Sequence, residues 1–458
     1  MIHFKLKNFR SINSAEIDIK GITVVSGENG CGKSTISRLL YNTFNIANNY
    51  ETLIKDSLNS KLADLHSLIH SIMKDIAFGR YGQRISEENE WLYYSGRKHF
   101  AIQENEDIED YLERIIATID KIEKVIIDAI ATQRSGNANG QRMYSQLLIQ
   151  QSIIRLCSIF GITIDDGELN ESDLAKAFEE IKKECASIIK QTSLAIDFRP
   201  LYFLNNELSL MFSQHIEDIS LHVSEFNTAI TNWDYNTLAQ PLEVRKCVYI
   251  DTPMAIGKKN KTKNPYWIKL NDLLESKDVE TSFWNNTNQI NHTLNNDVLK
   301  GSTYFDDEKI NPSFKYKRLD GKVFDLEECA TGIKSFGILQ ILLENGHLNK
   351  NSLLIIDEPE AHLHPQWVVE YARLIVLLNK HLNVKVLIAS HNPDMVSAIR
   401  YISEKEGILD QVGFYLAEKK DDDYTYDYTY LESDIEPIFA SFNIALDRIN
   451  QYGTITQE

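Results

Sequence analysis

Residues 27–35 read Gly27-Glu28-Asn29-Gly30-Cys31-Gly32-Lys33-Ser34-Thr35 (GENGCGKST), a full match to the phosphate-loop pattern G-x-x-x-x-G-K-[S/T]. A short β-branched strand is predicted before this loop, over residues 21–26, and apolar residues at helical spacing follow it over residues 36–44. Strand, glycine loop and helix form the context in which this pattern binds phosphate. The alternative, a glycine turn that holds no ligand, is disfavoured because the motif is complete.

The residue types in the loop suit a nucleoside triphosphate. Glycines let successive backbone N–H groups turn inward around phosphate oxygens, and a helix N-terminus favours negative charge. Lys33 is expected to reach the β- and γ-phosphates of ATP, and the Ser34 hydroxyl is expected to bind Mg²⁺. The candidate nucleotide-binding residues of the loop are Asn29, Gly30, Cys31, Gly32, Lys33, Ser34 and Thr35.

The composition limits the class of protein. The chain has 458 residues, 43% of them hydrophobic and 25% charged, and no apolar run is long enough to span a membrane. Its five cysteines include no C-x-x-C pair, which predicts reduced thiols and a cytoplasmic location. The net charge is −18, so contact with nucleic acid would require a local basic patch.

A second group of candidate residues lies late in the chain. Residues 351–358 contain an apolar run that ends in Asp357 and Glu358, as expected of a buried parallel strand whose carboxyl end faces a ligand. Asp357 is expected to hold Mg²⁺ together with Ser34, and Glu358 could polarise the attacking water. A solvated strand cap is the alternative, and the presence of a phosphate loop disfavours it.

The next predicted strand, residues 384–389, is followed by His391. A lone histidine is more often a structural residue than a functional one. Its position one strand after the two carboxylates favours a hydrogen bond from His391 to the γ-phosphate instead. The predicted catalytic residues are Glu358, His391 and Lys33.

Four motifs together resemble one family. GENGCGKST, NFRS at residues 8–11, LLIIDEPEAHLHP at residues 353–365 and SHN at residues 390–392 are similar to the ABC-type ATPases of the RecF, structural-maintenance-of-chromosomes and OLD group. The resemblance implies an α/β fold, an ABC-type head with a P-loop, a mixed sheet and flanking helices. It also implies ATP hydrolysis, an inserted mainly helical lobe, and two heads that sandwich ATP in a homodimer or higher homo-oligomer.

Periodicity and resemblance together predict two parts of the chain. Residues 1–50 and 300–458 are expected to form the head, and residues 51–299 the inserted, mostly helical lobe. Within the lobe, a helical hairpin is predicted near residues 107–160, where apolar residues recur at helical spacing on both sides of a polar turn.

The resemblance predicts a signature motif shortly before the strand that ends at Asp357, and residues 329–335 (CATGIKS) fit that place. Thr331 and Gly332 would open a helix and offer a hydroxyl and N–H groups to the γ-phosphate held by a second protomer. The motif departs from the family's common Ser-Gly-Gly-Gln, with Thr331 in place of serine. That departure weakens the detail of recognition between protomers.

Two further family positions are occupied. Residues 361–364 stand in the place of the D-loop, which accounts for His362 and His364 without a metal. Asp251, at the end of a predicted strand, is a candidate glutamine-loop equivalent by order alone.

The resemblance leaves more than one biological role open. DEPEAHLHP is similar to ATPase subunits of bacterial anti-phage systems such as Septu or PARIS, which work with a separately encoded nuclease or toxin. The alternative is a RecF- or chromosome-maintenance-like ATPase that binds DNA, against which the acidic net charge counts. The ATPase of a membrane transporter is disfavoured because such subunits place far fewer residues between phosphate loop and signature motif.

Overall fold

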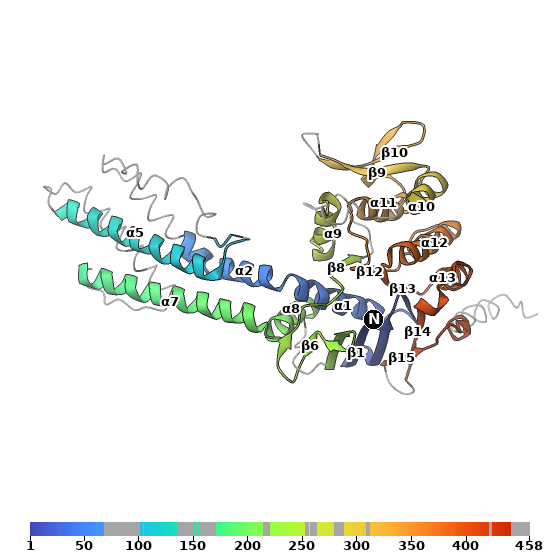
Figure 1. Cartoon of the computed structure of the whole chain (residues 1–458), viewed down its shortest axis with the longest axis horizontal. Coiled ribbons are helices and arrows are strands. Elements are labelled where there is room, and N and C mark those ends of the chain that lie inside the picture. The colour runs from blue at the N-terminus through green and yellow to red at the C-terminus, as the bar shows by residue number, and fades with distance from the viewer. Residues whose placement is uncertain are drawn as a thin grey trace, which may run out of the picture. The chain divides into compact units, whose positions relative to one another are not determined.

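The computed structural model describes residues 1–67, 101–103, 105–134, 151, 154, 171–213, 220–251, 256, 263–278, 288–307, 312–420 and 424–440 (Figure 1). The chain divides into two compact units, unit 1 with residues 1–48 and 200–458 and unit 2 with residues 49–199. Unit 2 is therefore inserted into the sequence of unit 1 directly after the helix that follows the phosphate loop.

In its described residues, unit 1 is built on a mixed ten-stranded sheet of order β5-β4-β1-β2-β15-β14-β3-β13-β12-β8. Its strands are β1 (Ile2–Phe9), β2 (Ile12–Ile19), β3 (Ile22–Ser26), β4 (Ser220–Glu225), β5 (Thr228–Ala229), β8 (Lys246–Ile250), β12 (Ser352–Asp357), β13 (Lys385–Ala389), β14 (Val412–Lys419) and β15 (Tyr426–Tyr430). The strands from β14 to β8 in this order run parallel, whereas β1 pairs antiparallel with β2 and β4. The predicted α/β head with a mixed sheet is confirmed.

The two halves of this sheet differ in burial, as their sequences require. Every residue of β3, β12 and β13 is buried, because helices cover both faces of a parallel sheet. In β1 and β2 buried residues alternate with partly exposed ones over much of each strand. The apolar runs that predicted central strands therefore belong to the strands nearest the phosphate loop.

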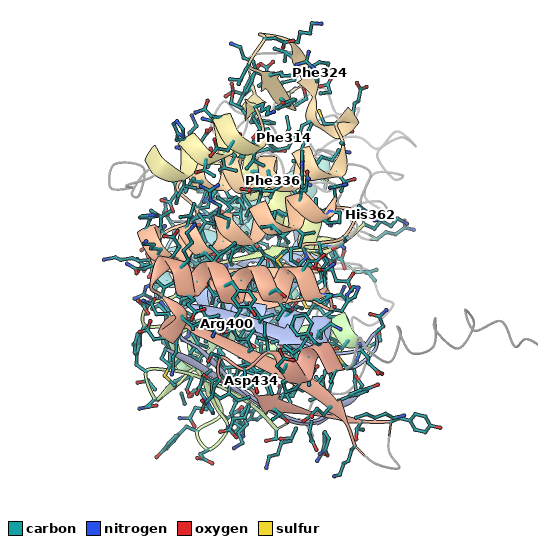
Figure 2. The ribbon with its side chains drawn as sticks, turned by 90° about the vertical axis from the view of Figure 1, so that its right-hand side faces the viewer. Phe314, Phe324, Phe336, His362, Arg400 and Asp434 are labelled. Carbon is teal, nitrogen blue, oxygen red and sulfur yellow. The ribbon has the colours of Figure 1, made fainter. Side chains whose placement is uncertain are left out.

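Helices flank the sheet of unit 1. They are α1 (Lys33–Asn48), α8 (Tyr202–Phe212), α9 (Pro265–Glu275), α10 (Asn288–His292), α11 (Thr331–Glu344), α12 (Pro365–Leu382) and α13 (Pro393–Glu406), with shorter helical turns at Thr293–Val298, Leu326–Glu328 and Leu409–Gln411. Helices α12 and α13 pack side by side (Figures 1 and 2). Both begin with proline, which suits the first helical position because the missing N–H would have no partner in the helix.

A smaller antiparallel sheet of order β11-β10-β9 precedes α11 in the chain and contains β9 (Gly301–Asp306), β10 (Ser313–Arg318) and β11 (Val323–Asp325). A two-stranded ribbon consists of β6 (Thr231–Asn232) and β7 (Thr237–Leu238). Figure 2 shows Phe324 on the small sheet and Phe336 in the layer of α11 and α12. The Phe336 ring packs edge-on against the rings of Trp367 and Tyr371, which joins α11 to α12.

Unit 2 is helical in its described part, with α2 (Tyr50–Lys61), α5 (Ile108–Arg134) and α7 (Glu171–Phe198). Helix α7 packs against both α2 and α5. Buried residues recur at helical spacing on the facing sides of α5 and α7. On α5 they are Tyr111, Ile115, Ile119 and Ile122, and on α7 they are Phe178, Ile181, Cys185 and Ile189. The second arm of the predicted hairpin, residues 143–160, lies outside the described residues apart from 151 and 154.

The predicted return to the head at residue 300 is wrong, because the chain re-enters unit 1 at residue 200. Strands β4 and β8, both within the predicted lobe, belong to the large sheet. Four of the five residues of β8 are buried, as expected of a strand covered by helices. An apolar run inside a helical region can belong to a distant sheet, and periodicity alone cannot reveal its partner strand.

Candidate functional site

The phosphate loop lies between the end of β3 and the start of α1. Gly30 and Gly32 have φ angles of 85° and 104°, in the region that glycine tolerates and other residues rarely adopt. A side chain at Gly30 would meet no atom within 4 Å, whereas one at Gly32 would come within 2.7 Å of Ile12. The open space at Gly30 fits a phosphate group that approaches the backbone closely.

Lys33 is buried at the start of α1, with 6% of its surface exposed. Its Nζ donates hydrogen bonds to the carbonyl oxygens of Gly27, at 2.8 Å, and Glu28, at 2.9 Å. The ammonium group is therefore folded back over the loop. Phosphate oxygens could replace these carbonyls as acceptors, with a stronger charge-assisted bond.

The predicted carboxylates and histidine meet the loop at one edge of the sheet. Strands β3, β13 and β12 are consecutive and parallel, with Val25 paired to Ala389 and Ala389 paired to Asp357. The backbone N–H of Ser390 donates to the carbonyl of Val25 at 3.1 Å, and that of Glu358 donates to the carbonyl of Ala389 at 2.8 Å. The carboxyl ends of the three strands therefore lie next to one another, as expected of a ligand site in a parallel sheet.

Asp357 is buried, and only one of its two carboxylate oxygens accepts a hydrogen bond from a described residue. Its Oδ2 accepts a hydrogen bond from the Tyr249 hydroxyl at 2.7 Å, while no described residue donates a hydrogen bond to Oδ1. Burial raises the pKa of Asp357, an effect opposed by the hydroxyls of Ser37, Tyr249 and Ser34. A buried carboxylate oxygen without a donor, next to serine hydroxyls, fits the oxygen ligands that Mg²⁺ prefers.

His391 lies between two glutamates at the end of β13. Its Nδ1 is 3.7 Å from Oε1 of Glu358 and 3.6 Å from Oε1 of Glu360. The side chains of Glu358 and His391 are 37% and 42% exposed, so both can reach a ligand, whereas that of Glu360 is 5% exposed. The positive φ of Glu358, 49°, marks a turn in the backbone directly after β12.

Glu360 holds the histidine segment in place and was not among the predicted site residues. Its Oε1 accepts hydrogen bonds from the Ser390 hydroxyl at 2.8 Å and from the His391 backbone N–H at 3.2 Å. Burial raises the pKa of Glu360, and the Ser390 hydroxyl and His391 oppose that shift. The only sequence signal for this role was the position of Glu360 two residues after Glu358.

A second group of polar side chains lies next to Asp357, and of its members only Asp251 was named from the sequence. The Tyr249 hydroxyl on β8 accepts a hydrogen bond from Nε of Arg38 at 3.4 Å, and Nη2 of Arg38 lies 3.5 Å from Oδ2 of Asp251. The Tyr266 ring packs edge-on against Tyr249 at 4.9 Å between centroids. This network links α1 to the ends of β8 and β12, and no local pattern joins its residues in the sequence. The glutamine-loop assignment of Asp251 stays a prediction.

Tyr249→Phe is expected to weaken Mg²⁺ binding about tenfold, because it removes the hydrogen bond that orients Asp357. The Mg²⁺ concentration needed for half-maximal hydrolysis should rise by the same factor, with little change in nucleotide affinity without metal. Tyr266→Phe, which leaves the Asp357 hydrogen bond intact, is the matched control. An unchanged Mg²⁺ titration in Tyr249→Phe would contradict the role given to this hydroxyl.

Thr331 and Gly332 open α11, which confirms the predicted helix start, whereas their assignment as a signature motif stays a prediction. Thr331 is partly exposed, and its carbonyl accepts a hydrogen bond from the Ser335 hydroxyl at 3.1 Å. A Cβ at Gly332 would lie 2.2 Å from the Trp367 ring, so only glycine fits between α11 and α12. The hydrogen bond of Thr331 therefore lies within α11, whereas Gly332 lies against α12. Residues 361–364, which directly precede α12, include the exposed His362 (Figure 2); their D-loop assignment stays a prediction.

Comparison with known proteins bears on this site. The model of a family described as "AAA ATPase domain" matches residues 1–396, which include the phosphate loop, Asp357, Glu358 and His391. The chain belongs to this AAA ATPase domain family. No curated protein matches the chain. Among its described residues, no helix is long and apolar enough to cross a membrane.

Solved structures similar to this AAA ATPase domain protein include two Smc head domains. One, from Pyrococcus furiosus, has an extended coiled coil and is bound to the C-terminal domain of ScpA. It is 13% identical in sequence to this chain, with a TM-score of 0.34, and the match covers 98% of this chain and 100% of the Smc chain. The other, from Pyrococcus yayanosii, has a coiled coil and joint; it shares 12% identity and a TM-score of 0.35, covering 97% of this chain and 100% of its own.

Proposed function

We propose that the protein binds Mg²⁺–ATP at the phosphate loop and hydrolyses it to ADP and phosphate. The observation that carries the proposal is the meeting of Lys33, Asp357, Glu358 and His391 at the carboxyl ends of three consecutive parallel strands. The loop would bind the β- and γ-phosphates through its N–H groups and Lys33. Ser34 and Asp357 would hold Mg²⁺, which when bound would neutralise phosphate charge.

The partly exposed Glu358 is the candidate general base. Its carboxylate would take a proton from the attacking water as the water oxygen bonds to the γ-phosphorus and the bond to the bridging oxygen breaks. His391 is placed beside Glu358 and could donate a hydrogen bond to the γ-phosphate. Glu360, by fixing the His391 backbone, would keep that donor in position.

We infer that the site is completed by a second copy of the chain. In the ABC-type group that the motifs resemble, the signature motif contacts the γ-phosphate on the opposite protomer. The proposal is supported by the partial exposure of Thr331 at the N-terminus of the 14-residue helix α11, where N–H groups favour an anion. ATP would then close a homodimer, and hydrolysis would open it.

We propose that this closure controls a separately encoded effector, a nuclease or toxin, in anti-phage defence. The DEPEAHLHP motif, residues 357–365, supports this role. The alternative, a DNA-binding repair or chromosome-maintenance ATPase, predicts ATP-dependent DNA binding that weakens steeply with salt. Affinity purification of the full chain, with and without ATP, separates them. Co-purification of the product of a neighbouring gene supports effector control, and salt-sensitive DNA retention supports the alternative.

Lys33→Ala is expected to weaken ATP binding about ten- to a hundredfold and to abolish turnover, because it removes the charged donor to the phosphates. Titration calorimetry with ATP and a phosphate-release assay measure both effects. Lys350→Ala, a change at an exposed lysine in a turn of unit 1, is the control and should behave as wild type. Full ATP affinity in Lys33→Ala would overturn the assignment of the loop.

A further inference from the structure

The strands on the other side of β3 form a second wall beside the phosphate loop. β14 is parallel to β3, and β15 is antiparallel to β14 and parallel to β2. The sheet edge that carries the loop therefore also contains three other segments: the carboxyl end of β14, the amino end of β15 and the turn between β1 and β2. The catalytic side chains occupy β13 and β12, on the opposite side of β3.

One tyrosine of β15 contacts the phosphate loop directly. The hydroxyl of Tyr428, which is buried, donates a hydrogen bond to the carbonyl of Cys31 in the loop at 3.0 Å. Its partner on β14, Ala417, lies against Gly27. Pairing with β14 is regular from Tyr426–Lys419 to Tyr428–Ala417, although the pairing with β2 shifts register between Tyr426 and Asp427. The side chain of Tyr426 therefore projects to the same face as that of Tyr428, nearer the sheet edge that carries the loop.

Tyr426 is half-buried at this edge, with its backbone fixed. Its N–H donates to the carbonyl of Ser11 at 2.8 Å, and it pairs in register with Ile12 and Lys419. Burial, and then the nearby Glu28 and Cys31, raise the pKa of Tyr426, so its ring stays neutral. An aromatic ring is thus held beside the loop, with part of its surface open to solvent.

A triphosphate in the loop must extend in one direction. Its γ-phosphate has to meet Glu358 and His391 on the side of β13 and β12. The α-phosphate and nucleoside then extend to the side of β14 and β15, where Tyr426 lies. We propose that Tyr426, with the backbone of the turn at Ser11, forms the nucleobase site and that its ring stacks on a purine base. The proposal rests on the proposed function, because it assumes that the loop binds a nucleotide.

The test compares ATP with inorganic tripolyphosphate, which has the phosphates but no base. Calorimetry on the full chain should show that Tyr426→Ala binds ATP about tenfold more weakly than wild type, with tripolyphosphate affinity unchanged within about twofold. Tyr426→Phe, which keeps the ring, should retain wild-type ATP affinity. Tyr430→Ala, at the opposite end of β15, is the matched control and should bind both ligands as wild type does.

The outcomes separate this inference from the proposed function. An unchanged ATP affinity in Tyr426→Ala would mean that the base site is elsewhere. The same conclusion follows if Tyr426→Ala loses affinity for ATP and tripolyphosphate equally and Tyr426→Phe does not restore it. In both cases the phosphate-loop assignment stands. If the wild-type chain binds neither ligand, the proposed function fails and the inference fails with it. A loss confined to ATP, recovered by phenylalanine, supports the base site.

Discussion

Glu358→Gln should bind ATP with near wild-type affinity and hydrolyse it at least about a hundredfold more slowly. Glutamine keeps the size of the side chain and its hydrogen-bonding oxygen but cannot take a proton from water. Glu358 is 37% exposed and contacts His391 directly after the end of β12, so the change should not disturb the core. Because hydrolysis would open the dimer, the variant should accumulate as an ATP-bound dimer.

Size-exclusion chromatography with light scattering, with and without Mg²⁺–ATP, measures this accumulation, and phosphate release measures turnover. Glu404→Gln, an exposed glutamate on α13 that pairs with Arg400, is the matched control. Wild-type turnover in Glu358→Gln would remove Glu358 from the role of general base. Slow turnover without dimer formation would leave the chemistry in place and contradict the link between ATP and closure.

Thr331→Glu should lower turnover about a hundredfold while ATP still binds to the phosphate loop of the same chain. A carboxylate at this position would repel the γ-phosphate of ATP bound to the other protomer. The variant should fold, because Thr331 is partly exposed and an acidic residue in the first turn interacts favourably with the helix dipole. Its defect should therefore be confined to the closed dimer.

Thr331→Ser is the conservative control, since serine retains the hydroxyl and is the residue common in the resembling family. It should keep most of the wild-type rate. ATP affinity by calorimetry, thermal unfolding and turnover should be measured for both variants. If Thr331→Glu hydrolyses ATP normally, the N-terminus of α11 does not contact the nucleotide.

Local sequence signals predicted the structure of the site best. The phosphate loop, the apolar run of β12 that ends in Asp357, and the helix opened by Thr331 each depend on a few consecutive residues, and the structure has strands and helices there. Glycine conformations, strand propensity and helix starts are set largely by neighbours in the chain. The α/β class with a mixed sheet follows from such segments taken in order.

Features that depend on distant pairing could not be predicted. β8 was predicted as a strand but placed in the inserted lobe, because only its pairing with β12 shows that it belongs to the large sheet. Tyr249 reaches Asp357 across 108 positions in sequence, and Tyr428 reaches Cys31 across 397. Single side chains that meet across such separations leave no periodic pattern, so the supporting contacts of the candidate site became visible only in the fold.

We propose that each ATP site combines the phosphate loop of one chain with Thr331 of another. Lys33→Ala and Thr331→Glu should each be inactive alone. The first lacks the loop lysine, and the second places a carboxylate against the γ-phosphate held by the other protomer. A mixed dimer of the two contains one site with an intact loop and an intact Thr331. Mixing equal amounts should therefore restore up to about a quarter of the wild-type phosphate-release rate, as expected for random pairing of two-fold dimers. No recovery in the mixture, with both variants folded, would contradict the shared site.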